Sequence, residues 1–190
     1  MAENRKIIAI AASTGGVDAL AKILPQLPAS TPPIALVLHM MPGFSKMLAA
    51  QFDGMYKISV KEARQDDCLL PGQMIIAPAG RHMQLVDRQG KFFVDFFSGV
   101  KVNDVIPSAD VLFESVAKIP QISAVGVILT GIGSDGAKGL KMMRDSGART
   151  IGQNKETSTI YGMPKVAMEM GAVEFQLPLN QIADKILSLI

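Results

Sequence analysis

Three residue types that can act together in nucleophilic catalysis follow apolar runs of the sequence. Ser13 and His39 each come at the end of such a run, and Asp135 lies in a glycine-rich stretch after a third. A serine hydroxyl is a weak nucleophile until an imidazole accepts its proton, and the imidazole needs a carboxylate to fix its tautomer and stabilise its charge. The sequence therefore predicts a triad of Ser13 as nucleophile, His39 as general base and Asp135 as the residue that orients the base.

The stretch from Ser13 to Gly16 allows three interpretations. Its two glycines could form a phosphate cradle, although neither G-x-G-x-x-G nor G-x-x-x-x-G-K-[ST] occurs in the sequence. Ser13 could instead be a nucleophile held at a strand-to-helix turn, as in hydrolases. It could also simply cap the helix that follows. The turn alone favours the interpretation of Ser13 as a helix cap. Only the presence of His39 and Asp135 at similar positions favours its interpretation as a nucleophile.

The other two members have structural alternatives as well. A histidine at a strand end is often a structural residue, and an aspartate in a glycine-rich turn is often a helix cap. The chain has two histidines, so the choice of base is narrow. His82, which precedes a predicted hairpin, is the second choice.

The elements that must position these residues form an α/β pattern. Long apolar runs without alternation are typical of parallel strands covered on both faces, and they occur at 7–12, 34–39, 73–78 and 123–129. Helices are expected between and after them, at 17–27, 44–52, 108–118, 137–146, 165–170 and 180–189. The helix at 108–118 is amphipathic, with a hydroxyl cap at Ser108. The expected fold is a doubly wound, mostly parallel sheet with helices on both faces and an appended antiparallel hairpin near residues 83–96. Its carboxyl edge would bring Ser13, His39 and Asp135 together.

The composition limits the classes of function. The 190 residues predict a single domain, 1–190, with no second unit. A net charge of +2 without a basic stripe argues against nucleic acid as a partner. The single cysteine, Cys68, excludes an internal disulfide or a cysteine metal cluster, and we expect no metal and no cofactor. The sequence has no signal peptide and no apolar run of about 18 residues, so we expect a cytoplasmic protein without membrane insertion.

An ordered set of short motifs covers nearly the whole chain. They are Ala12-Ser13-Thr14-Gly15-Gly16, His39-Met40 with Pro42-Gly43-Phe44, Leu70-Pro71-Gly72, Ile76-Ala77-Pro78, His82-Met83, Pro107-Ser108 with Asp110-Val111-Leu112-Phe113, Gly126-Val127-Ile128-Leu129-Thr130-Gly131, Asp135-Gly136 and Tyr161-Gly162-Met163-Pro164. With these motifs the chain resembles the catalytic domain of the chemotaxis protein-glutamate methylesterases.

The resemblance implies hydrolysis of γ-glutamyl methyl esters on the cytoplasmic helices of methyl-accepting chemotaxis receptors, with glutamine deamidation as a related activity. It assigns the triad to Ser13, His39 and Asp135, and one backbone donor of the oxyanion hole to Ile132. The start of the helix after Ser13, at Thr14, is expected to add another donor. Many family members carry a receiver domain, which here would be a separate or removed partner.

The sequence departs from the family pattern at one place that bears on recognition. Val105 and Ile106 stand where the family usually carries a His-Arg pair, so apolar groups replace a cation near an acidic substrate helix. This departure keeps an esterase for another methylated substrate open as an alternative. A second alternative is a non-catalytic module that binds a phosphate or a partner protein at the two glycine-rich turns.

Overall fold

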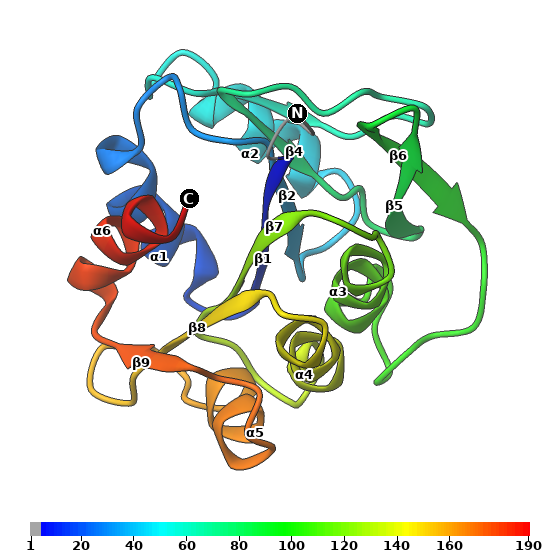
Figure 1. Ribbon diagram of the computed structural model, residues 1–190. Helices are drawn as coiled ribbons and strands as arrows, with labels where there is room; N and C mark the ends of the chain where they lie inside the picture. Colours follow the sequence, from blue (N-terminus) through cyan, green and yellow to red (C-terminus); the bar gives the residue numbers. More distant parts are fainter. Residues whose placement is uncertain (1–4) are drawn as a thin grey trace.

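The computed structural model describes residues 5–190 and is built around a seven-stranded sheet whose neighbouring strands all pair in parallel (Figure 1). The order of the strands across the sheet is β3-β4-β2-β1-β7-β8-β9. Their bounds are β1 (Lys6–Ala12), β2 (Ile34–Leu38), β3 (Ser59–Glu62), β4 (Gln73–Ile76), β7 (Ser123–Ile128), β8 (Arg149–Gln153) and β9 (Phe175–Leu177). The predicted doubly wound α/β fold is confirmed.

Helices cover both faces of this sheet. They are α1 (Gly16–Ile23), the 3-10 helix η1 (Leu24–Gln26), α2 (Phe44–Phe52), α3 (Ala109–Ala117), α4 (Ala137–Asp145), α5 (Met163–Glu169) and α6 (Leu179–Leu189). One hydrophobic core contains side chains of α1, α2 and α6, and a second core contains side chains of α3, α4 and α5. Figure 1 shows α1 and α6 on one side of the sheet and α3 and α4 on the other. In the part of the chain that the structure describes, no helix has the length and apolar character needed to cross a membrane.

The central strand β1 shows why the apolar runs do not alternate. Successive side chains of a strand point to opposite faces, and here both faces are covered. Ile7, Ala9 and Ala11 lie in the core beneath α3 and α4. Ile8 and Ile10 lie in the core beneath α1 and α6. Each buried isoleucine contributes about 1.5–3 kcal/mol relative to an exposed one, so a polar residue anywhere in this strand would destabilise the sheet.

The predicted hairpin is also present, but it forms a separate sheet. Strand β5 (His82–Arg88) pairs antiparallel with β6 (Lys91–Phe97), and neither strand pairs with the seven-stranded sheet. The two turn residues, Gln89 and Gly90, have φ angles of 53° and 83°, as tight hairpin turns require. The hairpin packs on α3, and Phe92 is buried in the same core as that helix, so hydrophobic packing holds it to the main body.

Two predicted helix boundaries were wrong, and proline explains both. The helix expected at 17–27 begins at Gly16 and ends as an α-helix at Ile23, with a 3-10 turn after it. Pro25 has no N–H to continue the α-helical hydrogen bonds, so the last turn tightens. The helix expected at 165–170 begins at Met163, because Pro164 fits the first turn, where no intrahelical N–H bond is needed.

The order of the strands places a switch point beside β1. The chain adds β2 and β4 on one side of β1 and then crosses over to place β7 on the other side. In doubly wound sheets, ligands bind outside the carboxyl ends of the strands at such a point. The segments that follow β1, β2 and β7 carry the three predicted triad residues.

Candidate active site

Backbone hydrogen bonds hold Ser13 between the ends of two neighbouring strands. The N–H of Ser13 donates to the carbonyl oxygen of Thr130 at 3.0 Å. The N–H of His39 donates to the carbonyl oxygen of Ala12 at 3.1 Å. The parallel pairing therefore continues past the strands into the site, and it places His39 on one side of Ser13 and the segment after β7 on the other.

Two glycines allow the turns of the site to approach one another. Gly15 has a φ of 81°, and a Cβ there would overlap the side chain of Thr159. A Cβ on Gly131 would lie 2.7 Å from the Cβ of Ser13, which is closer than real Cβ contacts allow. The sequence thus has glycine where the segment after β7 passes directly against Ser13.

His39 contacts the buried Asp135 through one ring nitrogen. Its Nε2 lies 2.8 Å from Oδ2 of Asp135. The His39 side chain is 14% exposed and the Asp135 side chain 3% exposed. An ionised carboxylate can only accept hydrogen bonds, so Nε2 carries the proton and Nδ1 is the basic nitrogen. Within residues 5–190 the Ser13 hydroxyl makes no hydrogen bond; in enzymes, such catalytic bonds tighten when substrate binds.

The Asp135 carboxylate accepts hydrogen bonds from five groups. Oδ2 accepts from His39 and, at 2.6 Å, from the N–H of Ala109. Oδ1 accepts from the Ser108 hydroxyl at 2.5 Å, the Asn103 amide at 2.9 Å and the N–H of Asp110 at 3.3 Å. Burial alone raises the pKa of Asp135, but the donors outweigh burial and hold the pKa below its usual value. The carboxylate is therefore ionised at neutral pH.

Asp135 is also a helix cap, but not of the helix that follows it. Its carboxylate accepts hydrogen bonds from the first N–H groups of α3, not from those of α4. The prediction that the Ser108 hydroxyl caps α3 was wrong, because this hydroxyl donates to Asp135 and makes no capping bond. The positive end of the α3 dipole thus points at the carboxylate that His39 contacts.

The two expected oxyanion donors are the backbone N–H groups of Thr14 and Ile132. In the described part of the chain, the N–H groups of Thr14 and Ile132 donate no hydrogen bond. Ile132 follows Gly131, whose backbone passes close to Ser13. Both residues are exposed, so a substrate oxygen can reach them.

His82, the second choice of base, lies away from this cluster. Its side chain is fully buried and stacks on Phe97, with 5.2 Å between the ring centroids. Its Nδ1 accepts the N–H of Ser108 at 3.2 Å, and its Nε2 lies 3.1 Å from the carbonyl oxygen of Val100. Within the described residues 5–190, both nitrogens of this ring are thus engaged with backbone groups.

Two polar residues of the site were missed by the sequence analysis. Asn103 bridges Asp135 and Asp110, and Asp110 accepts the N–H of Gly139 at 2.6 Å. Asp110 was part of a quoted motif and lay in the first turn of a predicted helix, which is common for acidic residues, but neither feature gave it a role in the site. Asn103 lies beside Asp104, and such a pair predicts a turn, but no sequence pattern gives the direction of its amide.

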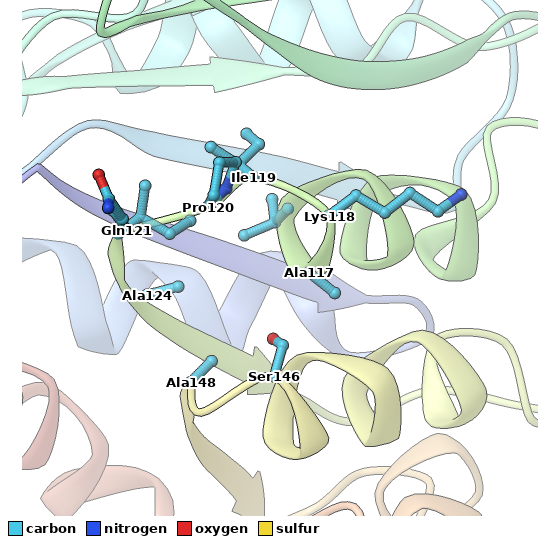
Figure 2. Close-up of a pocket in the computed structure, with 10 residues that line it drawn as sticks. Ala117, Lys118, Ile119, Pro120, Gln121, Ala124, Ser146 and Ala148 are labelled. Atoms are coloured by element: carbon cyan, nitrogen blue, oxygen red, sulfur yellow. The ribbon is translucent and has the colours of Figure 1, made fainter.

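Other parts of the described chain offer weaker candidates. A pocket of about 300 Å³ lies between the end of α3 and the start of β7, at the sheet edge opposite the triad (Figure 2). The described residues that line it include no His, Cys, Asp or Glu. Within residues 5–190, no three such side chains are grouped as metal ligands would be. The triad edge is therefore the candidate active site.

Comparison with known proteins identifies the family and the fold of the chain. The model of the CheB methylesterase family matches residues 8–186. The chain belongs to the CheB methylesterase family. The crystal structure of the Thermotoga maritima CheB methylesterase catalytic domain superposes with a TM-score of 0.94 at 38% sequence identity, covering 97% of this chain and 98% of that one. The resemblance read from the motifs is confirmed, and so is the fold.

Curated relatives of this CheB methylesterase family member carry a double name. The protein-glutamate methylesterase/protein-glutamine glutaminase 2 of Dechloromonas aromatica is 46% identical over 93% of this chain. The protein of the same name from Syntrophomonas wolfei is 47% identical over 100% of this chain. These matches cover 49% and 55% of the two relatives, so the chain spans about half the length of the curated relatives it matches.

Proposed function

We propose that this chain is a serine hydrolase that removes methyl esters from glutamate side chains of chemoreceptors and releases methanol. Its relatives are named for this reaction and for glutamine deamidation. The proposal rests on one observation above all, the 2.8 Å contact between Nε2 of His39 and the buried carboxylate of Asp135 beside Ser13. Such a pair serves to make a serine hydroxyl nucleophilic.

In the proposed reaction, Nδ1 of His39 accepts the Ser13 proton while Oγ attacks the ester carbonyl carbon. The Asp135 carboxylate stabilises the imidazolium, and the N–H groups of Thr14 and Ile132 donate to the oxyanion. The imidazolium then protonates the departing methoxide, which leaves as methanol. A water molecule, deprotonated by His39, hydrolyses the acyl-enzyme to glutamate and frees Ser13. With a glutamine side chain, the same steps release ammonia.

The partners and the location follow from this substrate. The methylated residues would lie on the cytoplasmic helices of chemotaxis receptors, so the chain would act in the cytoplasm. Residues 1–190 would form one catalytic domain, and a receiver domain would be a separate or removed partner.

A second candidate differs only in the substrate. Val105 and Ile106 are partly exposed in the segment that leads to Asn103 and Ser108, where the family usually carries a His-Arg pair. An apolar segment favours a methylated protein with a less acidic surface around the ester. Competition between methylated receptor and other methylated proteins, scored by methanol release, separates the two candidates.

The test compares Ser13→Ala with the wild type and with Ser134→Ala. Ser134 is an exposed serine in the other glycine-rich turn, so it controls for loss of a hydroxyl near the site. We expect Ser13→Ala to lose methanol release by on the order of a million-fold and to resist a fluorophosphonate probe, because no nucleophile is left. Ser134→Ala should keep both methanol release and reaction with the probe. Ser13→Ala activity above about a tenth of wild type would exclude Ser13 as the nucleophile.

A further inference from the structure

Asn103 lies in a tight turn beside the active site. Val102 and Val105 exchange backbone hydrogen bonds of 3.2 and 3.1 Å across this turn. The two residues between them, Asn103 and Asp104, have φ angles of 51° and 61°. Asparagine and aspartate tolerate this left-handed conformation better than most residues. Asn103 and Asp104 are both exposed residues with side chains of similar shape. The turn directs only the Asn103 side chain toward Asp110 and Asp135.

The Asn103 side chain reaches two buried carboxylates with a single nitrogen. Nδ2 donates to Oδ1 of Asp135 at 2.9 Å and to Oδ2 of Asp110 at 2.7 Å. An amide NH₂ group has two protons, so both are used. Within residues 5–190 the Asp104 side chain makes no hydrogen bond.

The two carboxylates need a donor between them. Each lies within reach of the same nitrogen, and like charges at such a separation repel strongly where water is excluded. Burial raises the pKa of Asp110, hydrogen bonds from Gly139 and Asn103 oppose this rise, and the charges of Asp135 and Glu114 add to it. Without the amide, repulsion would favour rotation of the Asp135 carboxylate.

We propose that Asn103 is a positioning residue for the triad, which holds Asp135 against Asp110 so that Oδ2 of Asp135 stays directed at His39. This role rests on the proposed function, since it matters only if His39 acts as a base. Asn103 itself reaches neither Ser13 nor His39 by a hydrogen bond in the described chain. Its effect would therefore pass through Asp135.

The turn offers a matched pair of substitutions for the test. Asn103→Gly and Asp104→Gly each remove the side chain of an exposed residue at a positive φ, which glycine adopts readily. We expect Asn103→Gly to lower kcat for methanol release, and the rate of fluorophosphonate labelling, by about ten- to hundred-fold, because a small misplacement of a catalytic group costs this much. Asp104→Gly should stay within about twofold of wild type. Asn103→Asp, which keeps the shape and removes the two donated protons, should lose as much as Asn103→Gly.

A spectroscopic measurement separates positioning from a merely structural role. The chain has two histidines, so the ring N–H signals of 15N-histidine protein report the His39–Asp135 bond and the His82–Val100 bond separately. We expect the His39 signal to shift or broaden in Asn103→Gly and to stay unchanged in Asp104→Gly. The His82 signal should stay unchanged in both, because it reports the fold of the neighbouring segment.

Two results would overturn this role for Asn103. One is an Asn103→Gly variant with the wild-type kcat and an unchanged His39 signal. The other is an equal change of both histidine signals with a lowered melting temperature, which would make Asn103 a purely structural residue. If the wild type itself neither released methanol nor reacted with the probe, the proposed function would fail, while the histidine signals would still decide whether Asn103 positions Asp135.

Discussion

The two histidines of the chain lie in contrasting surroundings. His39 follows the carboxyl end of β2, where one ring nitrogen binds a buried carboxylate and the other is left for a substrate or a nucleophile. His82 begins β5, where it is fully buried and both nitrogens bind backbone groups. The same side chain therefore serves as a candidate base in one place and as a structural connector in the other.

The difference teaches that burial alone does not mark a functional histidine. His82 is the more buried of the two, yet its neighbours are neutral backbone groups and the Phe97 ring. His39 faces an ionised partner whose pKa stays low because Ser108, Ala109 and Asn103 also donate to it. A base needs one nitrogen held and one nitrogen free, and only His39 meets this condition.

The largest expected effect comes from removing each histidine in turn. His39→Ala should lower kcat by on the order of a million-fold, as loss of a triad histidine does elsewhere, while the fold stays intact. His82→Ala should lower kcat far less. Instead it should lower the unfolding free energy by about 1–3 kcal/mol for each of the two groups left without a partner, the N–H of Ser108 and the carbonyl of Val100. Methanol release and urea unfolding of both variants decide this, and the reverse ranking of rates would refute His39 as the base.

A smaller but still large effect is expected from Asp135→Asn. The asparagine can donate to Nε2 of His39 and thus hold the wrong tautomer, which we expect to lower kcat by on the order of ten-thousand-fold. The His82 environment contains no carboxylate among its hydrogen-bond partners, so no equivalent change exists there. Because Asp135 also caps α3, the melting temperature should be measured beside the rate. A lowered melting temperature with a normal rate would reduce Asp135 to a cap.

Much of the fold could be predicted because its signals are local. Four apolar runs gave the central strands, and the ends of those runs gave the positions of Ser13 and His39. The turn at Gln89 and Gly90 gave the hairpin. These features depend on the periodicity of side chains and on glycine, both of which are visible in a single sequence.

The polar network behind His39 could not be predicted in the same way. It depends on how α3 and α4 pack against each other. Asp135 accepts the N–H of Ala109 at the start of α3, and Asp110 of α3 accepts the N–H of Gly139 in α4. A sequence shows that a carboxylate lies near a helix start, but not which helix receives it. For this reason the Ser108 hydroxyl was predicted to accept an N–H group of α3, whereas it donates to the Asp135 carboxylate.

The smallest expected effect concerns the carboxylates behind His39, and it is a pH dependence of stability. The pKa of Asp110 is raised above 3.8 by burial, so the folded state holds this proton at a pH where the unfolded state has lost it. The stability due to Asp110 is thus fully present below pH 3.8 and is lost as the pH rises through the folded pKa. The pH dependence due to Asp135 has the opposite sign, because the pKa of Asp135 is lowered in the folded state. The stability that Asp135 contributes is present above pH 3.8 and is lost as the pH falls through its folded pKa.

Replacement of Asp110 by asparagine isolates the first of these two contributions. The unfolding free energy of the wild type minus that of Asp110→Asn should decrease as the pH rises from 3.8 towards neutrality, since only the wild type must ionise a buried group there. Asp104→Asn changes the net charge by the same amount at an exposed position and serves as the control. Urea unfolding of the three proteins between pH 3 and 7 gives the differences. If the Asp110 difference stayed flat or increased with pH, the folded pKa of Asp110 would not be raised, and the hydrogen bonds from Gly139 and Asn103 would outweigh burial there.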